Sequence, residues 1–371
     1  MKEYLELLWT DYTLQVITLG TAILGATCGM LGSFAVLRKQ SLLGDAISHA
    51  ALPGIALIFL ITGTKDSTTL LIGALISGLI GSYWINGIIK RTRLKTDTAL
   101  GLILSLFFGV GILLLTFIQK MPDANQAGLD KYLFGQAATL VVKDVWIMGV
   151  VSVISLIVTL LFWKEIKLFL FDTEFSKTLG FKTNTINFLI TSLIVIAIVI
   201  GLQTVGVILM SAMLLAPAAA ARQWTNKLSV MVSLAAAFGA ISGVIGTAIS
   251  ASQNNLSTGP VIVIVAGVFV LISFIFSPSR GLLFKEIQKY QNRNDLKLFK
   301  TLTFMHEIAK THENIEHPHA IKILNNFQGF TKRSLEQLQQ REWIKLQNNM
   351  WSMTHKGFNA AQDIHLMGED E

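Results

Sequence analysis

The chain has 371 residues, of which 52% are hydrophobic and only 14% are charged, and its formal net charge is +7. This composition excludes a water-soluble globular protein and is typical of a polytopic membrane protein. The single cysteine, Cys28, cannot form a disulfide within one chain, and its glycine-rich surroundings favour a packing role.

Nine apolar stretches are long enough, or nearly long enough, to cross a bilayer as helices of about 20 residues. They cover residues 12–37, 41–62, 68–89, 97–119, 140–162, 184–201, 204–221, 228–250 and 259–277. The sixth and seventh stretches are short and only three residues apart, so one of them is a candidate for a broken or re-entrant segment. The sequence therefore predicts an all-α membrane domain with eight or nine transmembrane helices.

Basic residues alternate between the connections that join these stretches. The connections after the odd-numbered stretches are rich in them and contain Arg38, Lys39, Lys90, Arg91, Arg93, Lys95, Lys164, Lys167, Lys177, Lys182, Arg222, Lys227, Arg280 and Lys285. The other connections contain only Lys65, Lys120 and Lys131. Because lysine and arginine favour the cytoplasmic side, this pattern predicts an odd number of crossings, with the N-terminus outside and the C-terminus in the cytoplasm.

The second apolar stretch contains two ionisable residues, Asp45 and His49. Their spacing of four places a carboxylate and an imidazole on one helix face, and both groups bind divalent cations. If the span begins near Gln40, His49 lies about 14 Å along it, close to the middle of the hydrocarbon layer. Pro53 deprives the His49 carbonyl of its helical N–H partner, which adds an oxygen to this face.

Three roles fit this pair, and the sequence leaves all three open. Ionisable groups within a membrane are usually functional, which favours either a cation pathway or a proton relay. Polar groups also hold membrane helices together, which is the structural alternative. Weaker candidates for a pathway are Asp97, which opens the fourth stretch and also suits a helix cap, and Gln203, Met210 and Met213 near Pro217.

Residues 171–182, after the fifth stretch, predict a short polar helix with acidic residues at its start and glycine near its end. Such a helix fits docking to a cytoplasmic partner or an ordinary solvated connection. The chain contains no Gly-x-x-x-x-Gly-Lys-[Ser/Thr] phosphate loop. We therefore expect this chain to be no enzyme, with any ATP hydrolysis performed by another subunit.

Five stretches together resemble the membrane permeases of the manganese, zinc and iron ABC importers. They follow the family's order across about residues 10–280 and comprise 37–54 (LRKQSLLGDAISHAALPG), 97–101 (DTALG), 132–135 (YLFG), 171–180 (FDTEFSKTLG) and 205–220 (VGVILMSAMLLAPAAA). The resemblance implies a fold like that of type II ABC importers in a bacterial plasma membrane. It also implies that the chain binds no cofactor and carries Mn, Zn or Fe as cargo by alternating access.

The resemblance further implies partners and roles for particular residues. Two permease copies, identical or related, form the path within membrane lipid, two ATP-binding subunits dock below them, and an extracellular metal-binding protein delivers the ion. Asp45 and His49 line the path. The coupling helix corresponds to Asp172–Gly180, with Glu174 and Gly180 at positions like those that touch the ATPase. Asp172 and Phe175 are further candidates for coupling to the ATPase. A permease for iron chelates or vitamins is the alternative from the same fold class, although an organic cargo does not need the Asp/His pair.

Residues 1–280 are expected to form the permease domain and residues 281–371 a cytoplasmic α+β domain. From residue 285 the chain carries 12 Lys/Arg against 11 Asp/Glu and six of the seven histidines. The pattern predicts helices over 296–311, over 317–326 and from Thr331, then a hairpin around Asn348 and Asn349, and a last helix after Thr354. Residues 334–344 and 353–361 resemble the winged helix-turn-helix of iron-dependent metal repressors.

The resemblance to repressors makes DNA a candidate partner of this domain. Lys332, Arg333, Arg341 and Lys345 are the candidate contacts with DNA or a regulator. The near-neutral charge gives little attraction to phosphate, so a protein-contact or regulatory domain beside the ATPases is the alternative to a membrane-tethered, metal-responsive DNA-binding regulator. The histidines of residues 312–319 form either a metal-sensing site or a polar turn.

Overall fold

The computed structural model describes residues 11–64, 66–120, 135, 137, 140–252, 256–278, 280–312, 316–326, 330 and 332–368. The chain divides into two compact units, Met1–Gly281 and Leu282–Glu371.

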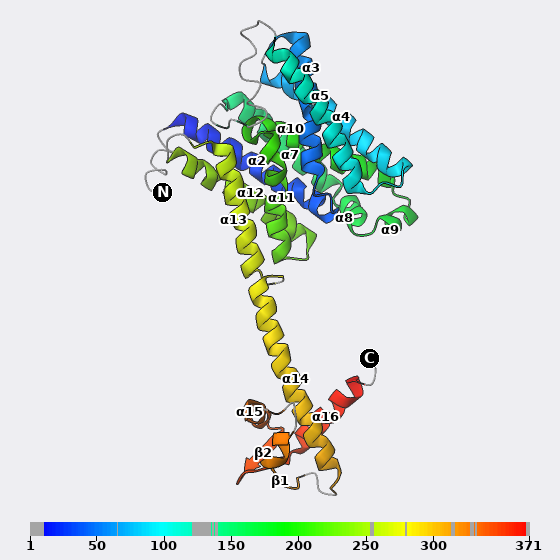
Figure 1. Ribbon diagram of the computed structural model, residues 1–371, viewed down its shortest axis with the longest axis vertical. Coiled ribbons are helices and arrows are strands. Elements are labelled where there is room, and N and C mark those ends of the chain that lie inside the picture. Colours follow the sequence, from blue (N-terminus) through cyan, green and yellow to red (C-terminus); the bar gives the residue numbers. More distant parts are fainter. Residues whose placement is uncertain are drawn as a thin grey trace. The chain divides into compact units, whose positions relative to one another are not determined.

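The first unit is a bundle of α-helices (Figure 1). They are α2 (Tyr12–Leu37), α3 (Leu43–Thr62), α4 (Ser67–Arg91), α5 (Thr96–Gln119), α7 (Val142–Leu161), α8 (Trp163–Phe171), α9 (Thr173–Thr178), α10 (Thr183–Val205), α11 (Val207–Trp224), α12 (Leu228–Ala251) and α13 (Thr258–Phe276). Within the described ranges, nine of these helices are long and apolar enough to cross a membrane, all except α8 and α9. These nine helices confirm the predicted all-α membrane fold.

A single glycine separates α10 from α11. The predicted break at residues 201–203 is wrong by a few residues, because α10 continues to Val205 and the chain turns at Gly206, whose φ is 85°. Gly135, with φ of 70°, packs against the backbone of Val205 and Gly206, where a side chain would overlap the Val205 carbonyl. Glycine is needed at both positions because other residues rarely adopt positive φ. Both helices remain long enough to span a bilayer.

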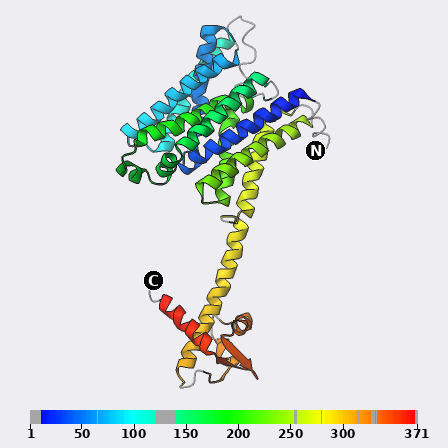
Figure 2. The ribbon, with the colours of Figure 1, turned by 180° about the vertical axis from the view of Figure 1, so that it is seen from behind.

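Close packing between helices rests on small residues. Helix α2 (blue) lies beside α12 in both views (Figures 1 and 2). Gly25 of α2 faces Gly239 of α12, and a Cβ at either glycine would overlap the other's carbonyl. One turn on, Gly29 meets the Ala235 carbonyl in the same way. Small residues let the two backbones touch, and such contacts drive helix association in lipid, where burial of apolar surface does not.

We expect Gly25→Val to destabilise the bundle by about 1–3 kcal/mol or more, because the added side chain forces α2 away from α12. Thermal unfolding in detergent, followed by size-exclusion chromatography, measures this loss. Gly267→Val in α13 is the matched control, since a Cβ at Gly267 meets nothing within 4 Å. Equal melting of the two variants would contradict the proposed contact.

The second unit combines helices with a small sheet. Its elements are α14 (Leu282–Lys310), β1 (His319–Ala320), the 3-10 helix η3 (Ile321–Asn326), α15 (Lys332–Gln340), β2 (Ile344–Gln347), β3 (Met350–Met353) and α16 (His355–Gly368). The strands are antiparallel in the order β1-β3-β2. Trp351 of β3 is fully buried, and Leu302 and Met305 of α14 pack with it in the core.

The structure confirms the predicted hairpin and corrects one predicted helix. Gln347 pairs with Met350, and Asn348 and Asn349 have φ of 48° and 64°, the left-handed turn that asparagine tolerates. The helix predicted over 317–326 is wrong, since this segment forms β1 and then η3. Pro318 lacks the N–H that a helix would use, and the next residue, His319, pairs with Trp351 in the sheet. The predicted cap Thr331 lies outside the described residues, and the winged-helix resemblance stays a prediction.

Candidate metal pathway and candidate partner-contact surface

Asp45 and His49 lie near the start of α3. The helix begins at Leu43, so Asp45 is in its first turn. His49 is six residues further than Leu43, about 9 Å along the helix axis. The value of about 14 Å expected from the sequence is therefore wrong, because residues 40–42 do not belong to the helix. Both side chains are half-buried.

Helix α3 is fixed by tight contacts with three neighbours. Gly54 lies against Gly73 of α4, backbone to backbone. One turn earlier, the Ser77 hydroxyl of α4 donates a hydrogen bond of 2.6 Å to the carbonyl of Ala50. A Cβ at Gly111 of α5 would lie 2.8 Å from the Cβ of Leu52, and one at Gly44 would lie 2.8 Å from the Cα of Ser211 in α11. These contacts fix the backbone of α3, from which Asp45 and His49 project.

The His49 imidazole is held by an aromatic contact and keeps an unpaired nitrogen. Its ring meets the ring of Phe108 edge to face, with 4.7 Å between centroids. The Nδ1 atom is buried and has no hydrogen-bond partner. A buried polar atom without a partner is costly and needs a reason. A nitrogen that served to hold helices together would be hydrogen-bonded, so this geometry favours a ligand role for His49.

The pair cannot hold an ion by itself. In the part of the chain that the structure describes, no three His, Cys, Asp or Glu side chains are grouped to bind a metal. Two protein ligands leave most positions around a divalent cation unfilled. The remaining ligands would come from backbone carbonyls, water or another chain.

The weaker pathway candidates have surroundings of their own. Asp97 is exposed in the first turn of α5, whose N-cap is Lys95, so the capping role expected for Asp97 is wrong. Met210 and Met213 are fully buried. The Met210 thioether fills the space beside Gly201, and the Met213 methyl lies beside Gly25. Packing accounts for both methionines, and their pathway role stays a prediction.

Gln203 belongs to a polar cluster that sequence reasoning missed. Its Nε2 donates to Asp144 Oδ2 at 3.0 Å, and its Oε1 accepts from the Ser67 hydroxyl at 2.7 Å. Asp144 is only 4% exposed and also accepts from the Val141 N–H at 3.2 Å. The cluster joins α4, α7 and α10. An acidic residue at the start of an apolar stretch was the available signal.

The segment predicted to dock a partner forms the short helix α9. Asp172 caps it by accepting a hydrogen bond of 2.8 Å from the Phe175 N–H. Glu174 pairs with Lys177 at 2.7 Å on the surface. Gly180 follows the helix with φ of 82° and open space around it.

Helix α9 and its C-cap residue, Leu179, expose large apolar side chains. Phe175 is 52% exposed and Leu179 is 55% exposed. Exposed aromatic residues among charged ones are typical of protein interfaces. The arrangement therefore suits contact with another protein.

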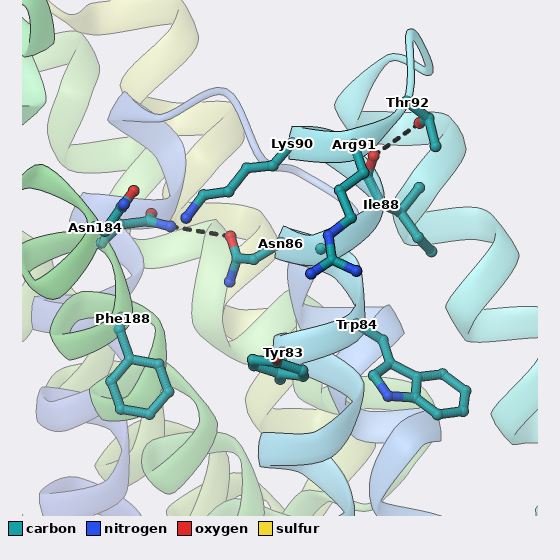
Figure 3. Close-up of a pocket in the computed structure, with 11 residues that line it drawn as sticks. Tyr83, Trp84, Asn86, Ile88, Lys90, Arg91, Thr92, Asn184 and Phe188 are labelled. Carbon is teal, nitrogen blue, oxygen red and sulfur yellow. Dashed lines mark hydrogen bonds between the residues drawn. The ribbon is translucent and has the colours of Figure 1, made fainter.

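A pocket of about 670 Å³ lies between the end of α4 and the start of α10 (Figure 3). Lys90 and Arg91 border it, and Tyr83, Trp84 and Phe188 supply aromatic surface. Asn187 also lines the pocket, and its side-chain oxygen accepts a hydrogen bond from Arg38. A second nitrogen of Arg38 donates to the Thr191 hydroxyl at 3.1 Å, and burial lowers the pKa of Arg38 to about 10.

Three of the four basic candidates of the second unit have partners within it. Arg341 lies 3.9 Å from Asp295 and stacks on Trp343. Lys345 lies 3.6 Å from Glu316, and Arg333 donates to the Tyr290 hydroxyl at 3.5 Å. The side chain of Lys332 lies outside the described part. These partners reduce the attraction for phosphate, and DNA binding stays a prediction.

Comparisons with known proteins give close matches. The family model of the ABC 3 transport family matches residues 10–277. The zinc transport system membrane protein TroC of Treponema pallidum is 52% identical over 278 residues, 75% of this chain and 93% of that protein. The manganese transport system membrane protein MntC of Bacillus subtilis is 41% identical over 373 residues, 96% of this chain and 85% of that protein. In the structure of PsaBC from Streptococcus pneumoniae in complex with Fab, one chain matches with a TM-score of 0.66 and 33% identity, covering 75% of this chain and 97% of that one.

Proposed function

Because the chain belongs to the ABC 3 transport family, we propose that it is the membrane permease subunit of an ATP-driven importer for a divalent transition metal. The observation that carries this proposal is the 52% identity to a zinc transport system membrane protein across 93% of its length. The unpaired His49 nitrogen beside Asp45, on a rigidly held helix, supports a metal as the cargo.

We propose a divalent transition metal as the cargo and do not choose among the individual metals. The relatives are named for zinc and for manganese. Carboxylate and imidazole ligands accept Mn, Fe(II) and Zn alike, so the Asp45/His49 pair does not choose among them. An organic cargo, as in a chelate or vitamin permease, does not call for a carboxylate and an imidazole within the helices.

Asp45 and His49 would exchange the ion's water for protein ligands during passage. A second permease copy would complete the coordination and form the other wall of the path. An extracellular binding protein would deliver the ion. Alternation between outward-open and inward-open states would be driven by ATP-binding subunits, because this chain lacks a phosphate-binding loop. Helix α9 would transmit their movement through Phe175 and its neighbours.

The orientation follows from the basic connections. With lysine and arginine on the cytoplasmic side, the N-terminus of α2 lies outside, whereas α9 and the second unit lie in the cytoplasm. This orientation places the start of α3, with Asp45, toward the cytoplasmic side of a bacterial plasma membrane.

The decisive experiment is metal uptake by vesicles that contain the permease with its ATPase subunits. We expect uptake of at least one of Mn, Zn and Fe(II). This uptake should require ATP on the side of the membrane that carries the ATPase subunits. Vesicles with the permease alone should be inactive. Uptake of equal rate without the ATPase would instead indicate a passive or proton-coupled carrier.

A further inference from the structure

Three histidines of the second unit gather at one place. His312 follows the end of α14, His317 lies two residues before β1, and His319 is the first residue of β1. The ring centroids lie 4.6 Å apart for His312 and His317, 4.9 Å for His312 and His319, and 5.1 Å for His317 and His319. Three mutual contacts between imidazoles are more than a polar turn requires.

The spacing matches that of three imidazoles around one tetrahedral ion. With Zn–N bonds of about 2.0–2.1 Å, each ring centroid lies about 3.2 Å from the metal, so two rings at the tetrahedral angle are about 5.2 Å apart. Within the described residues no three ligand side chains are yet arranged to hold a metal, and the His312 and His317 rings are inclined by only 19°. Binding of an ion therefore requires these side chains to rotate.

The hydrogen bonds leave the right nitrogens available. His312 Nδ1 lies 3.0 Å from the Thr311 hydroxyl and 3.4 Å from the Ile308 carbonyl oxygen. An Nδ1–H that donates to a carbonyl leaves Nε2 unprotonated, which is the usual state of a metal-bound histidine. His317 is exposed and gives an ion access from solvent.

His319 provides a second, independent observation. The residue is only 7% exposed, its ring lies 4.8 Å from that of Trp351, and its buried Nε2 has no hydrogen-bond partner. A buried nitrogen without a partner is costly, and a bound ion would supply the missing partner.

We propose that His312, His317 and His319 form a second metal site, specific for a borderline divalent ion such as Zn²⁺, that joins the end of α14 to β1. Three imidazoles bind Zn, Co, Ni or Cu more strongly than Mn. The site itself does not depend on the transport function. Its use as a sensor of imported metal does rest on the proposed function, since an ion that pins α14 to the sheet would report cytoplasmic metal to the transporter.

The test is titration of metal-free, full-length protein in detergent with Zn²⁺ and with Co²⁺, whose visible d–d bands report tetrahedral coordination. The wild-type protein should bind one ion that the triple variant His312→Ala/His317→Ala/His319→Ala lacks. His317→Ala, which changes an exposed side chain, should weaken this binding by about 10-fold or more. His355→Ala, an exposed histidine at the start of α16, should leave it unchanged.

Equal stoichiometry and affinity in the wild type and in His317→Ala would overturn the site and leave the three rings as packing. The His49→Ala variant separates the two sites, because it should retain the tetrahedral Co²⁺ spectrum. Loss of that spectrum in His49→Ala but not in the triple variant would also overturn the proposal. Neither result bears on ATP-driven uptake, which is measured separately.

Discussion

Asp45→Ala and His49→Ala are each expected to reduce ATP-driven metal uptake by about 100-fold or more, because removal of even a supporting group at a metal site costs 10–100-fold. The two side chains share one face of α3, and His49 Nδ1 has no other partner to lose. Uptake of radioactive or fluorescently detected metal into vesicles measures the effect. Assembly with the ATPase should be unchanged, since the close backbone contacts that hold α3 to its neighbours remain and His49→Ala removes only the ring contact with Phe108.

Ser48→Ala is the matched control for these two variants. Ser48 lies between Asp45 and His49 in sequence but is fully buried, and its hydroxyl has no hydrogen-bond partner. Loss of that hydroxyl should leave uptake within about 2-fold of the wild type, because no interaction is removed. Normal transport by both Asp45→Ala and His49→Ala would remove the pair from the path, whatever the cargo.

Much of the bundle was predictable because its determinants are local. A run of about 20 apolar residues has few alternatives to a membrane helix, so all nine stretches correspond to helices. Helix ends were less predictable. The sequence predicts that the second span includes Gln40, yet α3 begins only at Leu43. The break before α11 depends on the packing of Gly135 against Val205 and Gly206. Such contacts join residues that are distant in sequence.

In the candidate site, too, the local features were predictable from the sequence and the contacts between helices were not. The i, i+4 spacing of Asp45 and His49 was visible because a helix turn fixes it. The Phe108 contact and the unpaired Nδ1 were not, since they depend on how α5 lies against α3. Likewise Asp144 and Gln203 meet across two helices, and no local pattern predicts that they bond. The missing ligands of the Asp45/His49 pair are beyond any single-chain prediction if another copy supplies them.

Phe175→Ala is expected to uncouple the permease from its ATPase. Phe175 is 52% exposed on α9, where an aromatic side chain can anchor a partner surface. Truncation of such an anchor costs about 2 kcal/mol or more, which corresponds to roughly 30-fold weaker association. Binding of purified ATPase to the permease in detergent, and metal-dependent ATP hydrolysis in vesicles, should both fall.

Two comparisons separate an interface effect from a folding effect. Phe274→Ala removes a phenylalanine of 48% exposure from α13 and should leave ATPase binding unchanged. Gly180→Ala alters only the backbone, because φ is 82° and no atom lies within 4 Å of a Cβ there. The strain of about 1–2 kcal/mol should shift α9 and weaken binding of the ATPase, although the substitution removes no contacting side chain. If Phe175→Ala bound the ATPase as tightly as Phe274→Ala, α9 would be a solvated connection and the coupling surface would lie elsewhere on the permease.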